Sequence, residues 1–385
     1  MEIQKLKDIC LTEITDGTHQ TPTYSEYGYI FLSSKNVTTQ KIDWDNVMFI
    51  PEKLHEELYK RVAPQIDDIL LAKNGTTGVA AIVDRDIVFD IYVSLALIRP
   101  NTKIVMPRYL LYAINNPVVK GYFDSSLKGI GVPNLHLKNI RETPIKIYDL
   151  ETQKAIVEKL DKVCELISLR KQQLEKLDEL VKARFVEMFG DPVVNSKRWP
   201  VETIENHIDL LTGFPFDSSG YVSKGVNICG GLIIMPQKID WSACKHWPQI
   251  TGYEDYILRP NDIVIALDRP WISNGFKIAM VDREHLPALL IQRTARIRAV
   301  DINQHYLMQS LLLGRFDKHC NITGSLVPHI SPKDIKSYSV MIPPIELQNQ
   351  FASFVERVDQ QKQTVQQSLE KLELMKKALM QEYFG

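Results

Sequence analysis

LEKLDELVKARFVEMFG occupies residues 174–190, and LEKLELMKKALMQEYFG occupies residues 369–385. The two stretches share most of their letters and stand 195 positions apart. Internal repetition of this kind points to one structural unit used twice, so it has to be settled before any single motif is interpreted.

The repeat is longer than these two stretches. Shifted by 195 positions, residues 132–190 align without gaps onto residues 327–385, and about 18 of the 59 pairs are identical. Upstream the similarity is weaker and needs small changes of offset: KIDW at 41–44 returns at 238–241, and DDILLA at 67–72 resembles NDIVIA at 261–266. The chain is therefore predicted to be two halves, each a variable domain followed by a similar tail.

Both tails are predicted to be long helices. Apolar residues recur at steps of four and three, which is the heptad pattern of a coiled coil. Pro343 and Pro344 precede the second helix, while Gly190 and Pro192 end the first, as helix boundaries prefer. The heptad positions and helix-end aromatics that we expect in the coiled coil or at a partner are Leu160, Val163, Ile167, Leu174, Leu177, Phe185, Phe189, Val355, Val358, Leu369, Leu372, Tyr383 and Phe384.

The variable domains have a different pattern. Short β-branched and aromatic runs punctuated by Gly, Asn and Pro come first, and an apolar helix follows, at 106–116 in the first domain and near 305–314 in the second. This order predicts an α+β fold: two similar domains separated by two long helices that pair antiparallel, with an approximate two-fold internal repeat. The predicted boundaries are 1–150 and 191–345 for the domains, and 151–190 and 346–385 for the helices.

Composition limits the classes of protein. No apolar run approaches the ~20 residues of a membrane span, and the N-terminus lacks the apolar centre of a signal peptide. The five cysteines are scattered without a CxxC pair, so neither a disulfide framework nor a zinc site is indicated. We expect a cytoplasmic protein with no membrane partner. The net charge of −1 does not indicate a non-specific coat for nucleic acid, which is usually basic.

Catalytic signatures are missing from the sequence. It holds no P-loop, GxGxxG after a strand, HExxH or GxSxG. KNGTTG at 73–78 is the nearest approach to a phosphate cradle, but an ordinary strand–turn–strand is the favoured interpretation over a backbone-contact loop. A binding module is therefore favoured. Two alternatives stay open: a divergent stand-alone DNA methyltransferase or nuclease, and a coiled-coil scaffold with two protein-binding heads.

Two-fold symmetry offers a target for such a module. Duplex DNA has the same symmetry, and two-fold proteins bind two half-sites at a spacing that the protein fixes. A paired helix of about 38 residues is about 57 Å long, which matches roughly 17 base pairs.

The order of these segments resembles the specificity subunit of type I restriction–modification enzymes. The resemblance covers the whole chain and is carried by LETQKAIVEKLD, by LEKLDELVKARFVEMFGDP and by their second copies. ITDGTHQTPTY at 14–24, LAKNGTTG at 71–78 and GIGVPNL at 129–135 also resemble the family. The second domain departs from the pattern, since ALDRPWISNG at 266–275 replaces the expected Gly-rich turn.

The resemblance implies a chain without a catalytic centre. Each target-recognition domain would read one half of a bipartite site in double-stranded DNA, and the coiled coil would set the spacer and dock two modification (methyltransferase) subunits. S-adenosylmethionine, and for restriction ATP and Mg²⁺, would enter only through the modification and restriction (helicase–nuclease) subunits. The near-neutral charge of each domain indicates that phosphate binding is shared with these partners.

DNA contacts are expected from polar residues on the Gly-rich loops, because Arg and Lys suit guanine while Asn and Gln suit adenine. The candidates in the first domain are Thr18, His19, Lys35, Asn36, Lys73, Asn74, Thr76 and Thr77. The candidates in the second are Asp268, Arg269, Trp271, Asn274, Lys277, Arg293 and Arg296. Arg293 and Arg296 have an alternative role as ion-pair partners of acids such as Asp282 and Glu284.

Overall fold

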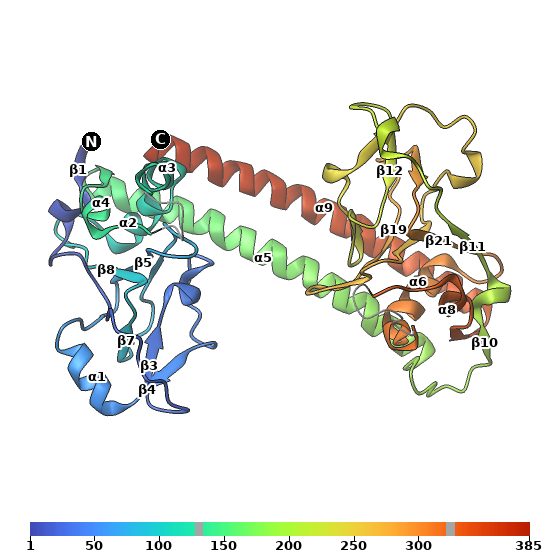
Figure 1. The fold of residues 1–385 in the computed structure, drawn as a ribbon, viewed down its shortest axis with the longest axis horizontal. Helices are drawn as coiled ribbons and strands as arrows, with labels where there is room; N and C mark the ends of the chain where they lie inside the picture. The colour runs from blue at the N-terminus through green and yellow to red at the C-terminus, as the bar shows by residue number, and fades with distance from the viewer. Residues whose placement is uncertain (128–133, 321–327) are drawn as a thin grey trace. The chain divides into compact units, whose positions relative to one another are not determined.

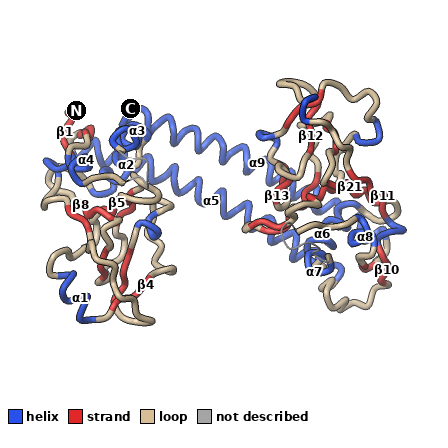
Figure 2. Tube along the Cα trace, viewed as in Figure 1, coloured by secondary structure: helices blue, strands red, loops and turns tan. Residues whose placement is uncertain are grey.

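The chain forms two compact units that each mix helices with small sheets (Figures 1 and 2). Unit 1 comprises Met1–Lys171 and Gln367–Gly385, and unit 2 comprises Gln172–Gln366. The predicted α+β class is confirmed. The computed structural model describes residues 1–127, 134–320 and 328–385.

Part of the sequence resemblance falls outside these ranges. Of GIGVPNL at 129–135, only Asn134 and Leu135 are described, and the second copy of the repeat is described from Pro328 onward.

Unit 1 is built on a four-stranded antiparallel sheet in the order β2-β8-β5-β6. The central strands read ILLA and LALI, and every side chain on them is buried, because both faces of the sheet are covered. A second sheet, β4-β3-β7, packs on one face, and β1 pairs with β9. The strands are β1 (Glu2–Lys5), β2 (Thr15–Asp16), β3 (Tyr29–Leu32), β4 (Met48–Ile50), β5 (Ile69–Ala72), β6 (Ala80–Ile82), β7 (Phe89–Ile91), β8 (Leu95–Ile98) and β9 (Pro144–Ile147).

Helices cover the other face of this sheet. Ile69 and Leu71 point into a core shared with these helices, whereas Leu70 and Ala72 point into the core between the two sheets, as the two-residue period of a strand requires. The short helices are α1 (Glu52–Tyr59), α2 (Pro107–Ile114), α3 (Pro117–Ser126) and α4 (Leu137–Arg141), with 3-10 turns η1 (Leu6–Ile9) and η2 (Ser34–Val37).

Unit 2 repeats this plan. Its four-stranded sheet has the order β11-β21-β16-β19, its three-stranded sheet is β15-β12-β20, and β10 pairs with β22. Two small hairpins, β13-β14 and β17-β18, are additions. The strands are β10 (Val201–Thr203), β11 (Ile208–Thr212), β12 (Val226–Cys229), β13 (Ile234–Met235), β14 (Lys238–Ile239), β15 (Lys245–Trp247), β16 (Ile263–Ala266), β17 (Trp271–Ile272), β18 (Gly275–Phe276), β19 (Ile278–Met280), β20 (Ala288–Leu290), β21 (Thr294–Ala299) and β22 (Ser339–Met341).

Among the described residues, three short helices follow the four-stranded sheet of unit 2 along the chain, as α2, α3 and α4 do in unit 1. Ile263 and Ile265 of β16 pack toward them, and Val264 packs toward the second sheet. The helices and 3-10 turns are α6 (Gln304–Leu313), α7 (Phe316–His319), α8 (Pro332–Lys336), η3 (Ile204–His207), η4 (Ser218–Gly220), η5 (Trp241–Ala243) and η6 (Glu254–Tyr256).

Matching polar contacts show how closely the plan is repeated. In unit 1 the Arg99 guanidinium donates from Nε to Asp68 Oδ1 (2.8 Å), and in unit 2 Arg298 donates from Nε to Asp262 Oδ1 (2.6 Å). Likewise the Tyr109 hydroxyl donates to the Lys146 carbonyl (2.7 Å), as the Tyr306 hydroxyl does to the Met341 carbonyl (2.8 Å). The internal repeat inferred from the sequence is thus a repeat of structure.

Two long helices, α5 (Leu150–Phe189) and α9 (Ile345–Phe384), each contribute one half to each unit. In unit 1, Lys159 Nζ donates to the Tyr383 hydroxyl (3.2 Å) and Lys171 pairs with Glu373 (3.3 Å), so the residue numbers rise on one helix as they fall on the other. The two segments therefore run antiparallel.

The helix segments of unit 2 also run antiparallel. Lys362 Nζ lies 2.5 Å from Asp178 Oδ1, and the Phe185 and Phe351 rings lie 5.5 Å apart. The predicted antiparallel pairing is confirmed within each unit.

Candidate nucleic-acid interface

The loop between β5 and β6 in unit 1 is fixed at its base by a buried ion pair. The Lys73 ammonium pairs with the Asp16 carboxylate at the end of β2, and both side chains are buried. Asp16 also binds His19, whose Nε2 lies 3.1 Å from its second oxygen. One carboxylate thus holds two predicted DNA-contact residues, and sequence reasoning missed it because residues 16 and 73 are far apart along the chain.

The turn before His19 requires glycine. A Cβ on Gly17 would lie 1.9 Å from the Ile91 carbonyl oxygen, so this backbone has to pass close to β7. Thr18 forms an isolated bridge with Tyr92, and the His19 side chain is left 70% exposed. The sequence therefore presents an imidazole on a rigid turn next to the β5–β6 loop.

The tip of that loop is exposed at Gly75 and Thr76. Gly75 and Gly78 have φ values of +75° and +82°, the left-handed region that glycine adopts without strain. Thr77 donates weakly to the carbonyls of Lys73 and Gly75 (3.4 Å each). The tip offers backbone groups and a threonine hydroxyl, while Asn74 at its base bridges Asn134.

The 3-10 turn η2 is the third polar segment, after the β5–β6 loop and the turn at residues 17–19. We call these three segments the polar rim of unit 1. The Ser34 amide donates to the Ser94 hydroxyl (3.0 Å), which brings η2 to the start of β8. Lys35 is exposed, whereas Asn36 is buried and donates to the carbonyls of Asp43 (3.3 Å) and Asn46 (2.9 Å). The Asn36 side chain is thus engaged in hydrogen bonds inside the protein, whereas Lys35 is accessible.

The equivalent loop of unit 2, between β16 and β19, carries the hairpin β17-β18. Trp271 packs on Phe276 with ring centroids 5.3 Å apart, and Asn274 is exposed at the hairpin turn. Arg269 is exposed and has φ of 46°, and its amide donates to the Pro328 carbonyl (2.9 Å). The segment ALDRPWISNG at 266–275, which departs from the family pattern, therefore forms an ordered loop that is longer than the β5–β6 loop of unit 1.

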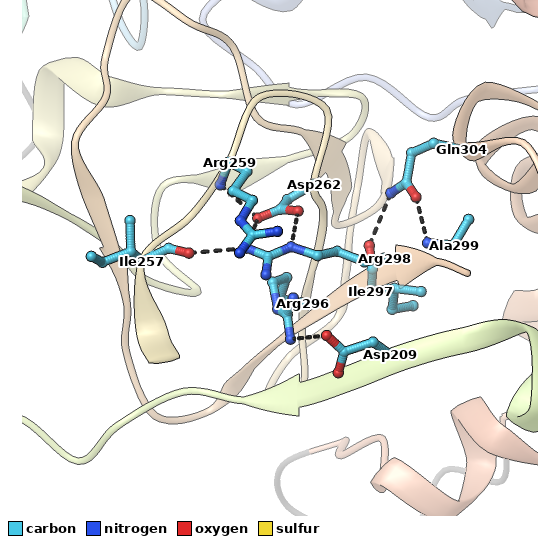
Figure 3. Close-up of polar contacts among 9 residues, drawn as sticks. All are labelled: Asp209, Ile257, Arg259, Asp262, Arg296, Ile297, Arg298, Ala299 and Gln304. Atoms are coloured by element: carbon cyan, nitrogen blue, oxygen red, sulfur yellow. Dashed lines mark hydrogen bonds and ion pairs between the residues drawn. The ribbon is translucent and has the colours of Figure 1, made fainter. Parts of the chain in front are cut away.

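Two predicted contact residues in unit 2 are buried. Lys277 donates to the Gly231 carbonyl, and burial lowers the pKa of its ammonium. Arg296 is only 3% exposed and donates from Nη2 to Asp209 (2.8 Å), beside the Arg298–Asp262 pair (Figure 3). Both cations have partners inside the protein.

Figure 3 shows the polar contacts that hold this region together. Gln304 accepts from the Ala299 amide (2.6 Å) and donates to the Ile297 carbonyl (2.9 Å), which ties α6 to the end of β21. The Arg296 and Arg298 side chains lie on the same strand; Arg296 meets Asp209 of the neighbouring strand β11, and Arg298 meets Asp262 immediately before β16. This network positions β21 and the residues immediately before it.

Arg293, immediately before β21, remains accessible. Its side chain is 74% exposed, and Nε lies 3.3 Å from Asp268 Oδ2. The other Asp268 oxygen accepts from His329 Nδ1 (2.7 Å). The predicted alternative partners are wrong, because Arg293 and Arg296 pair with Asp268 and Asp209, whereas Asp282 binds Trp241 and His285.

The heptad positions lie between the paired helices. Ile167, Leu174 and Leu372 are partly buried. The buried members are Leu160, Val163, Leu177, Val355, Val358 and Leu369.

The helix-end aromatics pack into the globular cores. Phe189 is fully buried and its ring lies 4.7 Å from that of Tyr306 in unit 2, while the Phe384 ring lies 5.2 Å from that of Tyr109 in unit 1. Phe185 is also fully buried, and Tyr383 packs at the edge of the unit 1 core. These rings pack the helix ends against the globular parts. Little of the surface of the rings is therefore left to contact a partner.

Among the residues described, no group of three or more His, Cys, Asp or Glu is arranged to hold a metal ion. None of the described helices is long and apolar enough to cross a membrane.

A fold used twice, with a rim of polar loops at the same place in each copy, defines a double recognition module. The family model for the type I restriction modification DNA specificity domain matches residues 1–179 and 250–374. The chain therefore belongs to this family, and the resemblance seen in the sequence is confirmed.

Curated relatives agree with this assignment. The type I restriction enzyme MjaVIII specificity subunit of Methanocaldococcus jannaschii is 25% identical over 340 residues, covering 83% of this chain and 79% of that protein. The type I restriction enzyme EcoAI specificity subunit of Escherichia coli is 27% identical over 210 residues, covering 50% of this chain and 34% of that protein.

Solved structures share the fold. The S subunit of a type I restriction–modification system from M. genitalium has a TM-score of 0.61 at 14% identity, covering 100% of this chain and 96% of that chain. A chain from a study of complex assembly in the type I R-M system has a TM-score of 0.55 at 18% identity, covering 100% of this chain and 97% of that chain.

Proposed function

We propose that this chain is the DNA-recognition subunit of a type I restriction–modification complex and that each unit reads one half of a bipartite DNA site. One observation carries the proposal. The same fold occurs twice, and equivalent loop positions carry different side chains, Asn74 and Ser94 in unit 1 against Asp268 and Arg293 in unit 2. A shared scaffold with different loop chemistry is what two different half-sites require.

The paired helices are the element through which we propose that the spacer between half-sites is set. They also keep exposed apolar side chains that do not enter the globular cores, among them Leu169, Leu180, Leu374 and Met375. Exposed apolar side chains on a helix are candidates for contact with a protein partner. Since the terminal aromatics are buried, these side chains are the better candidates for docking two modification subunits.

We propose that the chemistry belongs to the partners. S-adenosylmethionine would be held by the modification subunits, and ATP and Mg²⁺ by restriction subunits. With a net charge of −1, this chain has no excess of positive charge for binding phosphates, so the partners would also share the DNA backbone contacts.

The test is to express the full chain with its modification subunit and to map methylated adenines in the host DNA. The proposal predicts one motif made of two specified halves separated by a fixed unspecified gap. Binding of S-adenosylmethionine or DNA cleavage by the chain alone would instead favour a divergent enzyme. An intact complex with no sequence-selective DNA binding would favour a protein scaffold.

A further inference from the structure

The loops of unit 2 hold one exposed arginine in an ion pair. Arg293 Nε lies 3.3 Å from Asp268 Oδ2, and neither terminal nitrogen of the guanidinium donates a hydrogen bond to a described residue. Asp268 is itself anchored, because its other oxygen accepts from His329 Nδ1 (2.7 Å). An exposed long side chain is usually free to sample rotamers, so this arrangement reduces the entropy that a contact through Arg293 would cost.

The backbone under this group is held in an unusual shape. Arg293 has φ of 65° and Arg269, beside Asp268, has φ of 46°. Side chains other than Gly, Asn and Asp seldom adopt this region, and such strain tends to gather at functional sites. Two arginines on left-handed backbone therefore flank the carboxylate.

Unit 1 has the same backbone positions with different side chains. Asn74 bridges Asn134 as Asp268 bridges His329. The Lys73 amide donates to the Ser94 carbonyl (2.8 Å), as the Leu267 amide does to the Arg293 carbonyl (2.9 Å). At these three positions unit 1 carries Asn74, Ser94 and Asn134, and unit 2 carries Asp268, Arg293 and His329. A constant backbone with changing chemistry is expected where each unit selects its own sequence.

The geometry points to a specific role: we propose that Arg293 reads a guanine in the half-site bound by unit 2, with Asp268 as its positioning residue. The inference rests on the proposed function. The two terminal nitrogens of an arginine donate together to O6 and N7 of guanine, which is the commonest specific contact in the major groove. A carboxylate close to Nε matches the charge of the guanidinium and leaves its two terminal nitrogens for the base. His329 fixes the carboxylate.

The alternative role for an exposed arginine is a phosphate contact, which carries no sequence information. The two roles differ in how they respond to substitution. Lysine keeps the charge that a phosphate requires but lacks the planar fork that guanine requires. Arg293→Lys therefore separates them, and Arg293→Ala removes both.

The experiment uses the full chain assembled with its modification subunits and a pool of duplex DNA with randomised half-sites. Wild-type protein should select a guanine at one position of one half-site. Both Arg293→Ala and Arg293→Lys should lower the preference for that guanine roughly 5- to 150-fold and leave the other positions unchanged. Asp268→Asn should lower the same preference and no other.

Arg283→Ala is the matched control, since Arg283 is an exposed arginine elsewhere in unit 2. It should select the wild-type sequence. Because Arg293 is 74% exposed, its variants should assemble and melt like wild type. An unchanged motif in Arg293→Ala, or uniformly weakened binding that Arg293→Lys restores, would overturn the guanine role. A wild-type complex that selects no split motif would instead overturn the proposed function.

Discussion

His305, near the start of α6, is a buried histidine whose Nε2 has no hydrogen-bond partner among the described residues. Burial lowers the pKa of its imidazole, while Asp359 and Glu356 on α9 act in the opposite direction and only offset part of the effect. The folded state therefore binds this proton less readily than the unfolded state does. The stability that the neutral form provides is complete above about pH 6.5 and is lost as the pH falls below it.

His305→Asn removes this titration. We expect the difference in unfolding free energy between wild type and the variant to shrink as the pH falls from about 7 to 5. The measurement is urea unfolding of both proteins at several pH values. Asp359, whose pKa is raised by burial, interacts with His305, so the same comparison is repeated in the Asp359→Asn background to isolate the histidine. A constant difference over this range would show that His305 does not titrate there.

In each unit one aspartate pairs with the polar side chains of the rim, and this pairing could not be predicted from the sequence. Asp16 holds Lys73 and His19, and Asp268 holds Arg293 and His329. Most of these partners are tens of residues apart, so no local spacing identifies them. Sequence reasoning selected the rim segments by residue type, but it could not separate the buried Lys277 and Arg296 from the exposed Arg293.

Among the elements, those with a strong local pattern were predictable. The apolar runs of β5 and β16, the helix α2 and the heptads of α5 and α9 all lie where their patterns place them. The parallel partners β7 and β20 were missed, because pairing of distant strands leaves little local signal. The predicted candidates also omitted Asn134 and His329, which reach the rim only through long-range bridges.

The ends of the long helices follow a rule that periodicity does not reveal. The last turn of α5 packs into the core of unit 2, and the last turn of α9 packs into the core of unit 1. The core of unit 2 therefore includes the C-terminal end of the first repeat, and the core of unit 1 includes the C-terminal end of the second repeat. A heptad pattern shows which face of a helix is buried, but not which core receives its end.

Phe189→Ala tests this packing. The Phe189 ring is fully buried, 4.7 Å from Tyr306 and 5.6 Å from Phe351, so its removal leaves a cavity. We expect unit 2 to lose about 3–5 kcal/mol of unfolding free energy. Urea unfolding followed by tryptophan fluorescence measures it, since the Trp199 indole donates to the Phe189 carbonyl (2.9 Å).

Val186→Ala is the control for this variant. Val186 lies on the same turn region of α5 but is exposed, so its truncation should change the free energy by no more than about 0.5 kcal/mol. Equal effects of the two substitutions would contradict the packing role of Phe189.

At the scale of the whole molecule, the chain is one fold used twice with unequal loops. The Arg–Asp and Tyr–carbonyl contacts repeat, whereas the rim residues differ. The scaffold is therefore the same in both units while the loop residues differ, which suits a protein that reads two different sequences. The helices α5 and α9 are the elements that both units share.

The most direct test of this account changes those shared helices and nothing else. Four residues, 172–175 and 364–367, are deleted from each helix, which removes about one turn from both and keeps the apolar faces in register. The methylated motif of the complex is then mapped. The account predicts unchanged half-sites and a gap shorter by about 2 base pairs, since four residues span about 6 Å. A four-residue insertion at the same places should lengthen the gap equally. A gap that stays the same, or half-sites that change, would contradict the claim that two reading units are spaced by the helices.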